Sequence, residues 1–282
     1  MKRFFKYFTI SITSSFFILI IIISCSSNKI ILEEKDGFDM VPSGDHKLAT
    51  KTLSQGNVTV LFESGLGDSG NRWIFSGITQ MLEEYAKVIV YCRAGIYPSD
   101  KTDTLATIEN MIIDLDSVIT TLADDDILIL VGHSLGGAII RAYSVKYPEK
   151  VSGLVFVDSS HEVSLQGRTD EYFAGKLQSL GIKEHNVVYK EFKEFQNTLK
   201  YLETLQNMPD VPVIALSALG YEGYSLDERS KSFINAHKSM GIGLSDFTHI
   251  EVSHSGHYIQ IDQPEIVTSA ILEVLNKVKK KE

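Results

Sequence analysis

The sequence predicts an α/β fold, in which a mostly parallel central sheet carries helices on both faces. Strand-like and helix-like segments alternate along the chain, which is typical of this architecture. Residues 127–131 are apolar throughout, as expected of a strand that is buried on both faces of a parallel sheet. Removing an N-terminal segment of 24 residues from the 282 leaves 258, enough for one such domain with an insertion.

The individual elements follow from apolar periodicity and from turn residues between the periodic segments. We expect residues 46–53 and 57–63 to form an opening antiparallel pair of strands. The remaining expected elements are strands at 87–92, 127–131, 153–157, 212–217 and 249–253, and helices at 105–122, at 135–147 and from Pro264 onward.

A long gap between Ser159 and Pro209 interrupts the alternation of strands and helices. Within it, large apolar residues recur at intervals of three and four, which is one face of a helix. These residues are Tyr189, Phe192, Phe195, Leu199 and Leu202. We therefore expect a small helical cap at about 160–209, whose apolar face is packed against the domain, lines a ligand pocket, or does both.

The N-terminus has the features of a bacterial secretion signal. Lys2, Arg3 and Lys6 precede an unbroken apolar run at 16–23, which is shorter than the roughly 20 residues that a membrane span needs. Residues 22–25 read Ile-Ile-Ser-Cys and resemble the lipobox of bacterial lipoproteins, in which cleavage leaves a cysteine for lipidation. A plain signal peptide and an uncleaved anchor are the alternatives.

This interpretation predicts a signal peptide at 1–24, a lipid on Cys25, a tether at 25–36 and the folded domain at 37–282. The mature protein is then expected outside the cytoplasm, anchored by its lipid to a membrane of the bacterial cell envelope. The removed segment holds three basic and no acidic residues, so the formal net charge changes from −9 to −12. Such a charge argues against a nucleic-acid partner.

Gly132, Ser134 and Gly136 form a G-x-S-x-G pattern between an expected strand and an expected helix. A serine held in so sharp a turn needs small neighbours, and the pattern is typical of a nucleophilic serine. Such a serine also requires a histidine base, an acid that orients the histidine, and amide donors for an oxyanion. A glycine-rich turn that merely contains a serine is the alternative.

Residues 255–260 place His257 in a loop between the last expected strand and the closing helix. The preceding glycine frees this loop to turn toward Ser134, so we expect His257 to be the base and His254 to be its rival. The other histidines that we expect to be structural or solvated are His46, His161, His185, His237 and His249. No cluster has metal-ligand spacing and no nucleotide motif is present, so neither a metal nor a cofactor is implied.

Four stretches of the sequence resemble the α/β-hydrolase superfamily of esterases, lipases and epoxide hydrolases: residues 61–73, residues 91–100, the serine turn and residues 255–264. The first contains Glu-Ser-Gly-Leu-Gly and is similar to the oxyanion loop of the superfamily. By position, this resemblance implies that the amides of Leu66 and Leu135 are the oxyanion donors.

The second stretch departs from the family pattern, because Cys92 stands where relatives usually have a structural aspartate. A nucleophilic Cys92 is the weaker alternative to Ser134, since no glycine-flanked turn presents it. We expect the neighbouring Arg93 to be a structural ion-pair or hydrogen-bond partner rather than a substrate clamp.

The order of the triad in this superfamily places the acid between Ser134 and His257. Most relatives have it after the strand that ends here near 217, where this chain offers only Glu222 and Asp227. A minority have it one strand earlier, and Asp158 directly follows the expected strand at 153–157. We expect Asp158 to be the acid and keep the other two carboxylates as alternatives.

The resemblance implies a capped serine hydrolase that cleaves a carboxylic ester of a small molecule through an acyl-enzyme. Ser134 would attack, His257 would transfer the proton and Asp158 would orient the imidazole. A serine at the nucleophile position argues against epoxide hydrolase and dehalogenase chemistry, which need an aspartate there. The alternatives are a C–C bond hydrolase or acyltransferase on the same triad, and a non-catalytic ligand-binding lipoprotein.

Overall fold

The computed structural model describes residues 32–123, 127–165, 169–179, 181–221 and 228–280. The expected signal peptide and Cys25 lie outside these residues, as do Glu222 and Asp227. Within the described ranges, no helix has both the length and the apolar character that crossing a membrane requires.

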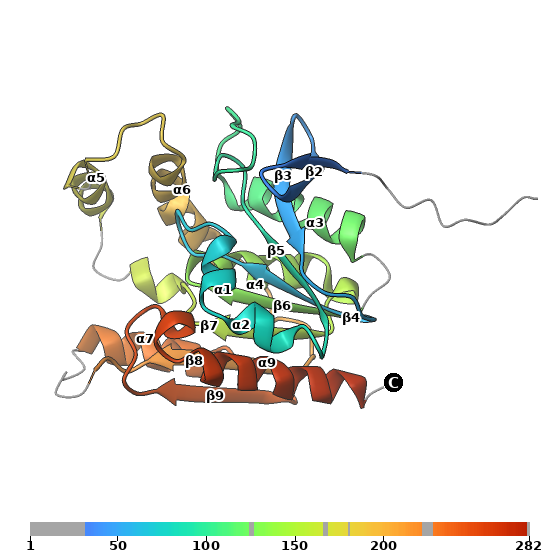
Figure 1. Cartoon of the computed structure of the whole chain (residues 1–282). Coiled ribbons are helices and arrows are strands. Elements are labelled where there is room, and N and C mark those ends of the chain that lie inside the picture. Colours follow the sequence, from blue (N-terminus) through green and yellow to red (C-terminus); the bar gives the residue numbers. More distant parts are fainter. Residues whose placement is uncertain (1–31, 124–126, 166–168, 180, 222–227, 281–282) are drawn as a thin grey trace, which may run out of the picture. The chain divides into compact units, whose positions relative to one another are not determined.

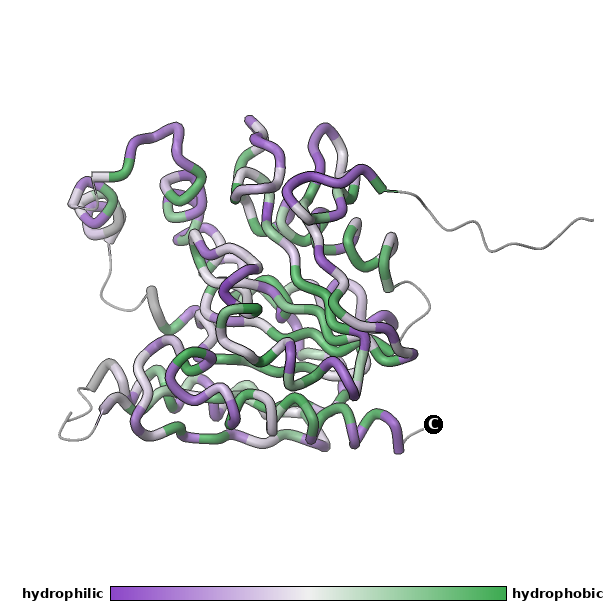
Figure 2. The backbone as a smooth tube through the Cα atoms, in the orientation of Figure 1, coloured by the Kyte–Doolittle hydropathy of each residue, from purple (hydrophilic) through white to green (hydrophobic). Residues whose placement is uncertain are grey.

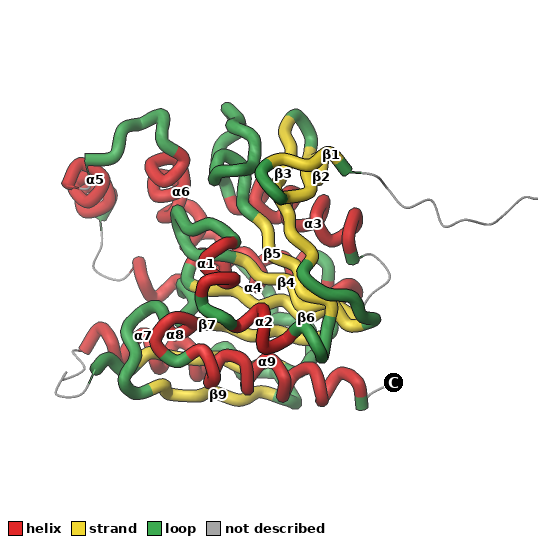
Figure 3. The backbone as a smooth tube through the Cα atoms, in the orientation of Figure 1, coloured by secondary structure: helices red, strands yellow, loops and turns green. Residues whose placement is uncertain are grey.

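The strands of the described chain form one nine-stranded sheet, in the order β1-β2-β3-β5-β4-β6-β7-β8-β9 (Figures 1 and 3). The pairs β1–β2, β2–β3 and β3–β5 are antiparallel, and every pair from β5 to β9 is parallel. This arrangement confirms the predicted fold class. The strands are β1 (Glu33–Lys35), β2 (Phe38–Ser43), β3 (His46–Thr52), β4 (Val58–Glu63), β5 (Lys87–Tyr91), β6 (Ile127–His133), β7 (Gly153–Val157), β8 (Val213–Ala218) and β9 (Phe247–Val252).

Helices cover both faces of the sheet (Figure 1). The α-helices are α1 (Asn71–Phe75), α2 (Ile78–Leu82), α3 (Ile108–Leu122), α4 (Leu135–Lys146), α5 (Asp170–Ser179), α6 (Val187–Leu202), α7 (Glu228–Ser239), α8 (Ile259–Asp262) and α9 (Pro264–Lys279). Two short 3₁₀ helices are η1 (Pro148–Lys150) and η2 (Glu162–Leu165).

Alternate residues of β6 enter two separate hydrophobic cores, because successive side chains of a strand point to opposite faces. Leu128 and Leu130 pack into the core that contains α3 and α4. Ile129 and Val131 pack into the core beneath α1, α2 and α9. Figure 2 shows the corresponding apolar band through the central strands. The buried strand β6 therefore ends directly before Ser134.

The expected antiparallel pairing of 46–53 with 57–63 is wrong. β5 lies between these two strands, antiparallel to β3 and parallel to β4. The link between them has turn-like residues, yet β4 is buried along its whole length, and its two edges pair with β5 and β6. Two strands before β3 were not predicted. One of them, β1, occupies part of the segment at 25–36 for which the sequence predicts a tether.

The segment between β7 and β8 contains η2, α5 and α6, where the sequence predicts a helical cap. Asn186 caps the start of α6, since its side chain accepts a hydrogen bond from the Val188 amide at 2.9 Å. Leu199 and Leu202 are buried in the core that contains α3 and α4. The C-terminal end of the apolar stripe therefore serves packing. A further helix, α7, follows β8 and was not predicted.

Candidate active site

Ser134 lies between β6 and α4 with φ 53° and ψ −120°. A positive φ is costly for a residue with a side chain, so the surrounding structure must hold it there. A Cβ atom on Gly132 would lie 2.6 Å from the Gly136 carbonyl oxygen, and one on Gly136 would lie 2.4 Å from the Glu63 carbonyl oxygen. Only glycine fits at these two positions, which explains the G-x-S-x-G pattern.

The backbone of Ser134 is tied to the neighbouring strand β7. Its amide donates to the Val157 carbonyl at 3.2 Å, and its carbonyl accepts from the Ser160 amide at 2.9 Å. The Ser134 side chain makes no N-cap hydrogen bond to α4, although serine commonly does so at this position. Its hydroxyl is therefore not committed to capping the helix.

The structure brings His257 and Asp158 together. Nδ1 of His257 lies 2.7 Å from Oδ2 of Asp158, whose other oxygen accepts a hydrogen bond from the Ala218 amide at 3.0 Å. Burial alone would raise the pKa of the Asp158 carboxyl, but the hydrogen bond and charge of His257 outweigh it, so the pKa is lowered. Asp158 is therefore an ionised acceptor that fixes the proton of His257 on Nδ1.

His133 precedes the serine and holds the loop that carries His257. Nε2 of His133 lies 2.9 Å from the His257 carbonyl oxygen, and the centroids of the two rings are 4.7 Å apart. Burial, followed by the charge of His257, lowers the pKa of His133 to about 3. The ring is therefore neutral, and its proton is assigned to Nε2 because a carbonyl can only accept. This residue was missed, because it stands at the variable position of the motif.

Of the other histidines, His237 lies near the acid, since it lines a small cavity together with Asp158. His254 has an exposed side chain and a backbone φ of 55°. Nε2 of His237 lies 2.7 Å from the Ser159 carbonyl, and Nε2 of His46 lies 3.0 Å from Asp114. The remaining three are a buried His161, a partly buried His249 and an exposed His185.

The two expected oxyanion donors belong to the start of α4 and to the turn after β4. Leu135 is the first residue of α4, where backbone amides have no partner within the helix. Leu66 lies in a turn that the Asp68 amide closes by donating to the Gly65 carbonyl at 3.1 Å. Gly67 permits this turn through a φ of 72°.

Arg93 is a buried ion-pair partner, as expected, and contacts Glu63 at 2.7 Å and Glu191 at 2.8 Å. Sequence reasoning missed Glu191. Although its side chain is buried, its sequence neighbours on α6 are those of an ordinary surface glutamate. The neighbouring Cys92 is buried, and its sulfur lies 3.3 Å from Oγ of Ser69. Burial raises the pKa of the Cys92 thiol, so it is poorly suited to nucleophilic attack.

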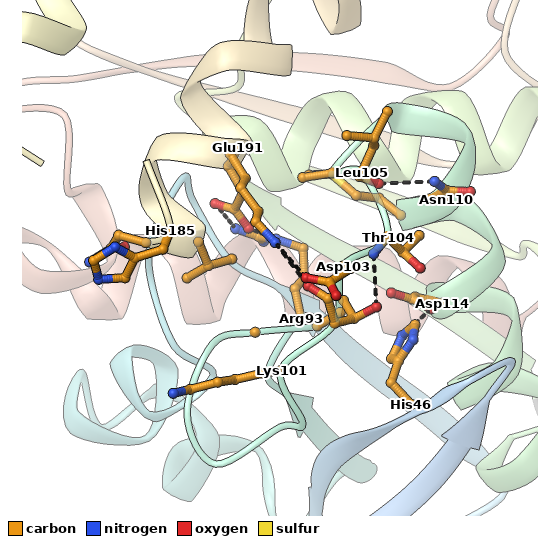
Figure 4. Close-up of a pocket in the computed structure, with 18 residues that line it drawn as sticks. His46, Arg93, Lys101, Asp103, Thr104, Leu105, Asn110, Asp114, His185 and Glu191 are labelled. Atoms are coloured by element: carbon orange, nitrogen blue, oxygen red, sulfur yellow. Dashed lines mark hydrogen bonds and ion pairs between the residues drawn. The ribbon is translucent and has the colours of Figure 1, made fainter. Parts of the chain in front are cut away.

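A cavity of about 570 Å³ lies beside Arg93, between the loop after β5, the start of α3 and the N-terminal half of α6 (Figure 4). Its polar lining includes His46, Asp114 and Lys190. Neither Ser134 nor His257 lines it, so it is not the space directly above the serine. Among the described residues, no group of three or more histidine, cysteine or acidic side chains could hold a metal ion.

A family model described as alpha/beta hydrolase fold matches residues 58–182, which include Ser134 and Asp158. Nine strands in the order given above support the same assignment. The chain has the α/β-hydrolase fold. Among solved structures it is similar to an esterase from Thermogutta terrifontis, with 18% identity and a TM-score of 0.64 over 86% of this chain and 98% of that chain.

A variant of an epoxide hydrolase from Bacillus megaterium shares the α/β-hydrolase fold, with 15% identity and a TM-score of 0.66 over 85% of this chain and 100% of that chain. Over 31 residues, 11% of this chain, the sequence is 58% identical to a (Lyso)-N-acylphosphatidylethanolamine lipase of Mus musculus. The chain covers 9% of that lipase, and 27% of a relative from Arabidopsis thaliana that is 31% identical over 93 residues. Because one fold hosts esterases and epoxide hydrolases, the α/β-hydrolase fold alone does not identify the reaction.

Proposed function

We propose that this protein is a serine hydrolase that cleaves a carboxylic ester through an acyl-enzyme on Ser134. One observation carries the proposal: a serine with strained backbone at the end of β6 is combined with a 2.7 Å contact between His257 and Asp158. A histidine and an aspartate paired in this way activate a nucleophile. The hydroxyl of Ser134 can take this role because it is not used to cap α4.

The reaction follows from the proton positions. With Nδ1–H donated to Asp158, the imidazole of His257 presents Nε2 as the acceptor for the Ser134 proton. Oγ then attacks the ester carbonyl carbon, and the amides of Leu66 and Leu135 receive the developing oxyanion. The tetrahedral intermediate collapses when His257 returns its proton to the leaving alcohol, which leaves an acyl group on Ser134.

Deacylation repeats these steps with water. His257 takes a proton from the water, whose oxygen attacks the acyl carbonyl, and the proton returns to Oγ of Ser134 as the carboxylic acid leaves. Asp158 stays ionised throughout and stabilises the imidazolium that forms in each half-reaction. These steps transfer protons and an acyl group and involve no change of oxidation state.

Two further observations favour ester chemistry. Epoxide opening by this fold uses an aspartate nucleophile that forms an alkyl ester, and position 134 is a serine. The similar structures and relatives include proteins named as an esterase and as a lipase. A small-molecule ester is therefore the substrate class we propose.

The test is covalent labelling of the folded mature chain with a fluorophosphonate, read by intact mass and by peptide mapping. We expect one adduct, on Ser134, and none in Ser134→Ala. Hydrolysis of p-nitrophenyl esters of increasing chain length then ranks the acyl groups. An unlabelled Ser134 in folded protein, with no hydrolysis of any of these esters, would refute the proposal.

We also propose that Cys25 carries a lipid that anchors the mature enzyme outside the cytoplasm of a bacterial cell. The support is the Ile-Ile-Ser-Cys sequence at 22–25 after a basic and apolar segment. A lipidated cysteine with more than one acyl chain binds a membrane stably, whereas a single chain does so only marginally.

A further inference from the structure

The side chain of Arg93 lies directly behind the turn that carries the Leu66 amide. Arg93 is 3% exposed, and its guanidinium donates to two successive carbonyls of this turn. Nη1 donates to the Ser64 carbonyl at 2.6 Å, and Nη2 donates to the Gly65 carbonyl at 2.6 Å. A positive charge is thereby held against the backbone just before Leu66.

The second of these carbonyls belongs to the same peptide unit as the Leu66 amide. The cis peptide bond of the described chain joins Tyr97 to Pro98, so the unit from Gly65 to Leu66 is trans. In a trans peptide the N–H points away from the C=O. With the Gly65 carbonyl fixed on Arg93, the Leu66 N–H must point to the opposite side of the turn.

The charge of Arg93 also strengthens this donor. A cation that draws electron density from a carbonyl oxygen polarises the whole peptide unit, and in a dry interior this effect is large. The Gly65 oxygen accepts a second hydrogen bond, from the Asp68 amide, which adds to the polarisation. The amide of Leu66 is thus oriented and made more acidic before any substrate binds.

Glu191 connects this arrangement to the cap. Figure 4 shows Glu191 reaching from α6 to Arg93. Its Oε1 accepts from Nε of Arg93 at 2.8 Å, and its Oε2 accepts from Nη2 at 3.0 Å. The same Oε2 accepts a hydrogen bond from the Gly67 amide at 2.7 Å, on the far side of Leu66. Hydrogen bonds to the backbone on both sides of Leu66 therefore hold the turn.

Glu63 completes the network from β4. Its Oε1 accepts from Nη1 of Arg93 at 2.7 Å and from the Ser64 amide at 3.1 Å, and the Tyr91 hydroxyl donates to its other oxygen. The charges of Glu191 and Glu63 outweigh burial and raise the pKa of Arg93, so the guanidinium stays charged. Buried ion triads are often no more stabilising than apolar side chains of the same volume. In this triad, Arg93 and Glu191 also form hydrogen bonds to the backbone of the turn that carries Leu66.

We propose that Arg93 is a positioning residue for the oxyanion hole: held by Glu191 of the cap helix, it orients and polarises the Leu66 amide. This inference rests on the proposed serine hydrolase mechanism. It also makes the cap part of the catalytic apparatus, because α6 supplies a carboxylate that fixes both Arg93 and the Gly67 amide.

The experiment compares Arg93→Lys and Glu191→Gln with wild type. A lysine keeps the charge but cannot bridge both carbonyls, so we expect kcat to fall about 10- to 100-fold, less than the roughly 10²- to 10³-fold loss on removing an oxyanion donor. KM should stay within about threefold, because the amide acts mainly on the transition state. Glu191→Gln keeps an acceptor for the Gly67 amide and should lose less.

A trifluoromethyl ketone gives the readout that a general structural defect would not change. It adds to Ser134 as a tetrahedral oxyanion, so its inhibition constant should rise by the same factor as kcat falls. The matched control is Arg141→Lys, since Arg141 also forms two hydrogen bonds to one glutamate, Glu162, at 2.7 and 3.3 Å. This control should leave kcat and the inhibition constant within about twofold.

Far-UV circular dichroism and urea unfolding establish that each variant is folded. If Arg93→Lys does not fold, Glu191→Gln alone decides the inference through the same two constants. A folded variant whose kcat and inhibition constant match wild type would overturn the inference while leaving the proposed function intact. A wild-type protein that takes no label on Ser134 would overturn both.

Discussion

Replacing His133 with glutamine separates two roles of this side chain. The imidazole donates from Nε2 to the His257 carbonyl at 2.9 Å and is buried as a neutral ring. The amide of glutamine can make the same hydrogen bond but cannot take up a proton. The substitution should therefore preserve most of the activity and change how stability depends on pH.

The size of this change follows from the pKa of His133, which is lowered from 6.5 to about 3 in the folded protein. Below pH 6.5, His133 binds a proton in the unfolded chain but not in the folded chain. The free energy of unfolding therefore decreases as the pH falls. Between pH 7 and pH 5 this single group should lower that free energy by about 2 kcal/mol. His161 and His237 contribute in the same direction, since burial lowers their pKa values too.

Urea unfolding of wild type and His133→Gln at pH 7 and pH 5 measures the effect. The loss of unfolding free energy on acidification should be about 2 kcal/mol smaller in the variant, because the other histidines titrate in both proteins. Equal losses in the two proteins would show that His133 is protonated in the native state at pH 5. The neutral imidazole next to His257 would then be ruled out.

Three other predictions concern the triad and the anchor. His257→Ala should lower kcat by several orders of magnitude and His254→Ala only mildly, as measured by ester hydrolysis in folded protein; equal losses would reject His257 as the base. Asp158→Asn should lower kcat by up to about 10⁴ with little change in KM, because the imidazole loses its tautomer and its charge partner; a collapse in Asp227→Asn instead would reassign the acid. Cys25→Ala should move the mature-sized protein from the detergent-extracted membrane fraction to the soluble fraction, and its retention on membranes would exclude lipidation as the anchor.

The central part of the fold could be predicted because it depends on local patterns. The apolar run at β6, the glycines around Ser134 and the helix that follows are consecutive in the sequence, and each constrains the next. Asp158 was expected to be the acid from its place directly after the strand at 153–157, and its carboxylate contacts Nδ1 of His257. Patterns in consecutive residues, together with the order of the triad in the superfamily, were sufficient for these residues.

The features that were missed depend on contacts between distant segments. The position of β5 between β3 and β4 is set by sheet pairing, which the turn-like residues 53–57 do not encode. Glu191 is 98 residues from Arg93, and nothing in its local sequence distinguishes it from the exposed charges of the same helix. His133 is similar, since its partner is a backbone carbonyl 124 residues away.

The position of Asp158 after β7 has a consequence for how this protein can change over evolution. β8 lies between β7 and β9, and the Ala218 amide at its end donates to Asp158 at 3.0 Å. The amides of Leu219 and Gly220, which follow, donate to the carbonyls of Val252 and Ser255. In the proposed triad, the segment that follows Ala218 therefore has no reacting side chain to keep in place. Insertions or deletions after Tyr221 can remodel the approach to α7 while the backbone contacts of Ala218, Leu219 and Gly220 keep the triad in place. We expect natural variation in substrate preference to be concentrated in this segment, which makes it a suitable target for loop libraries.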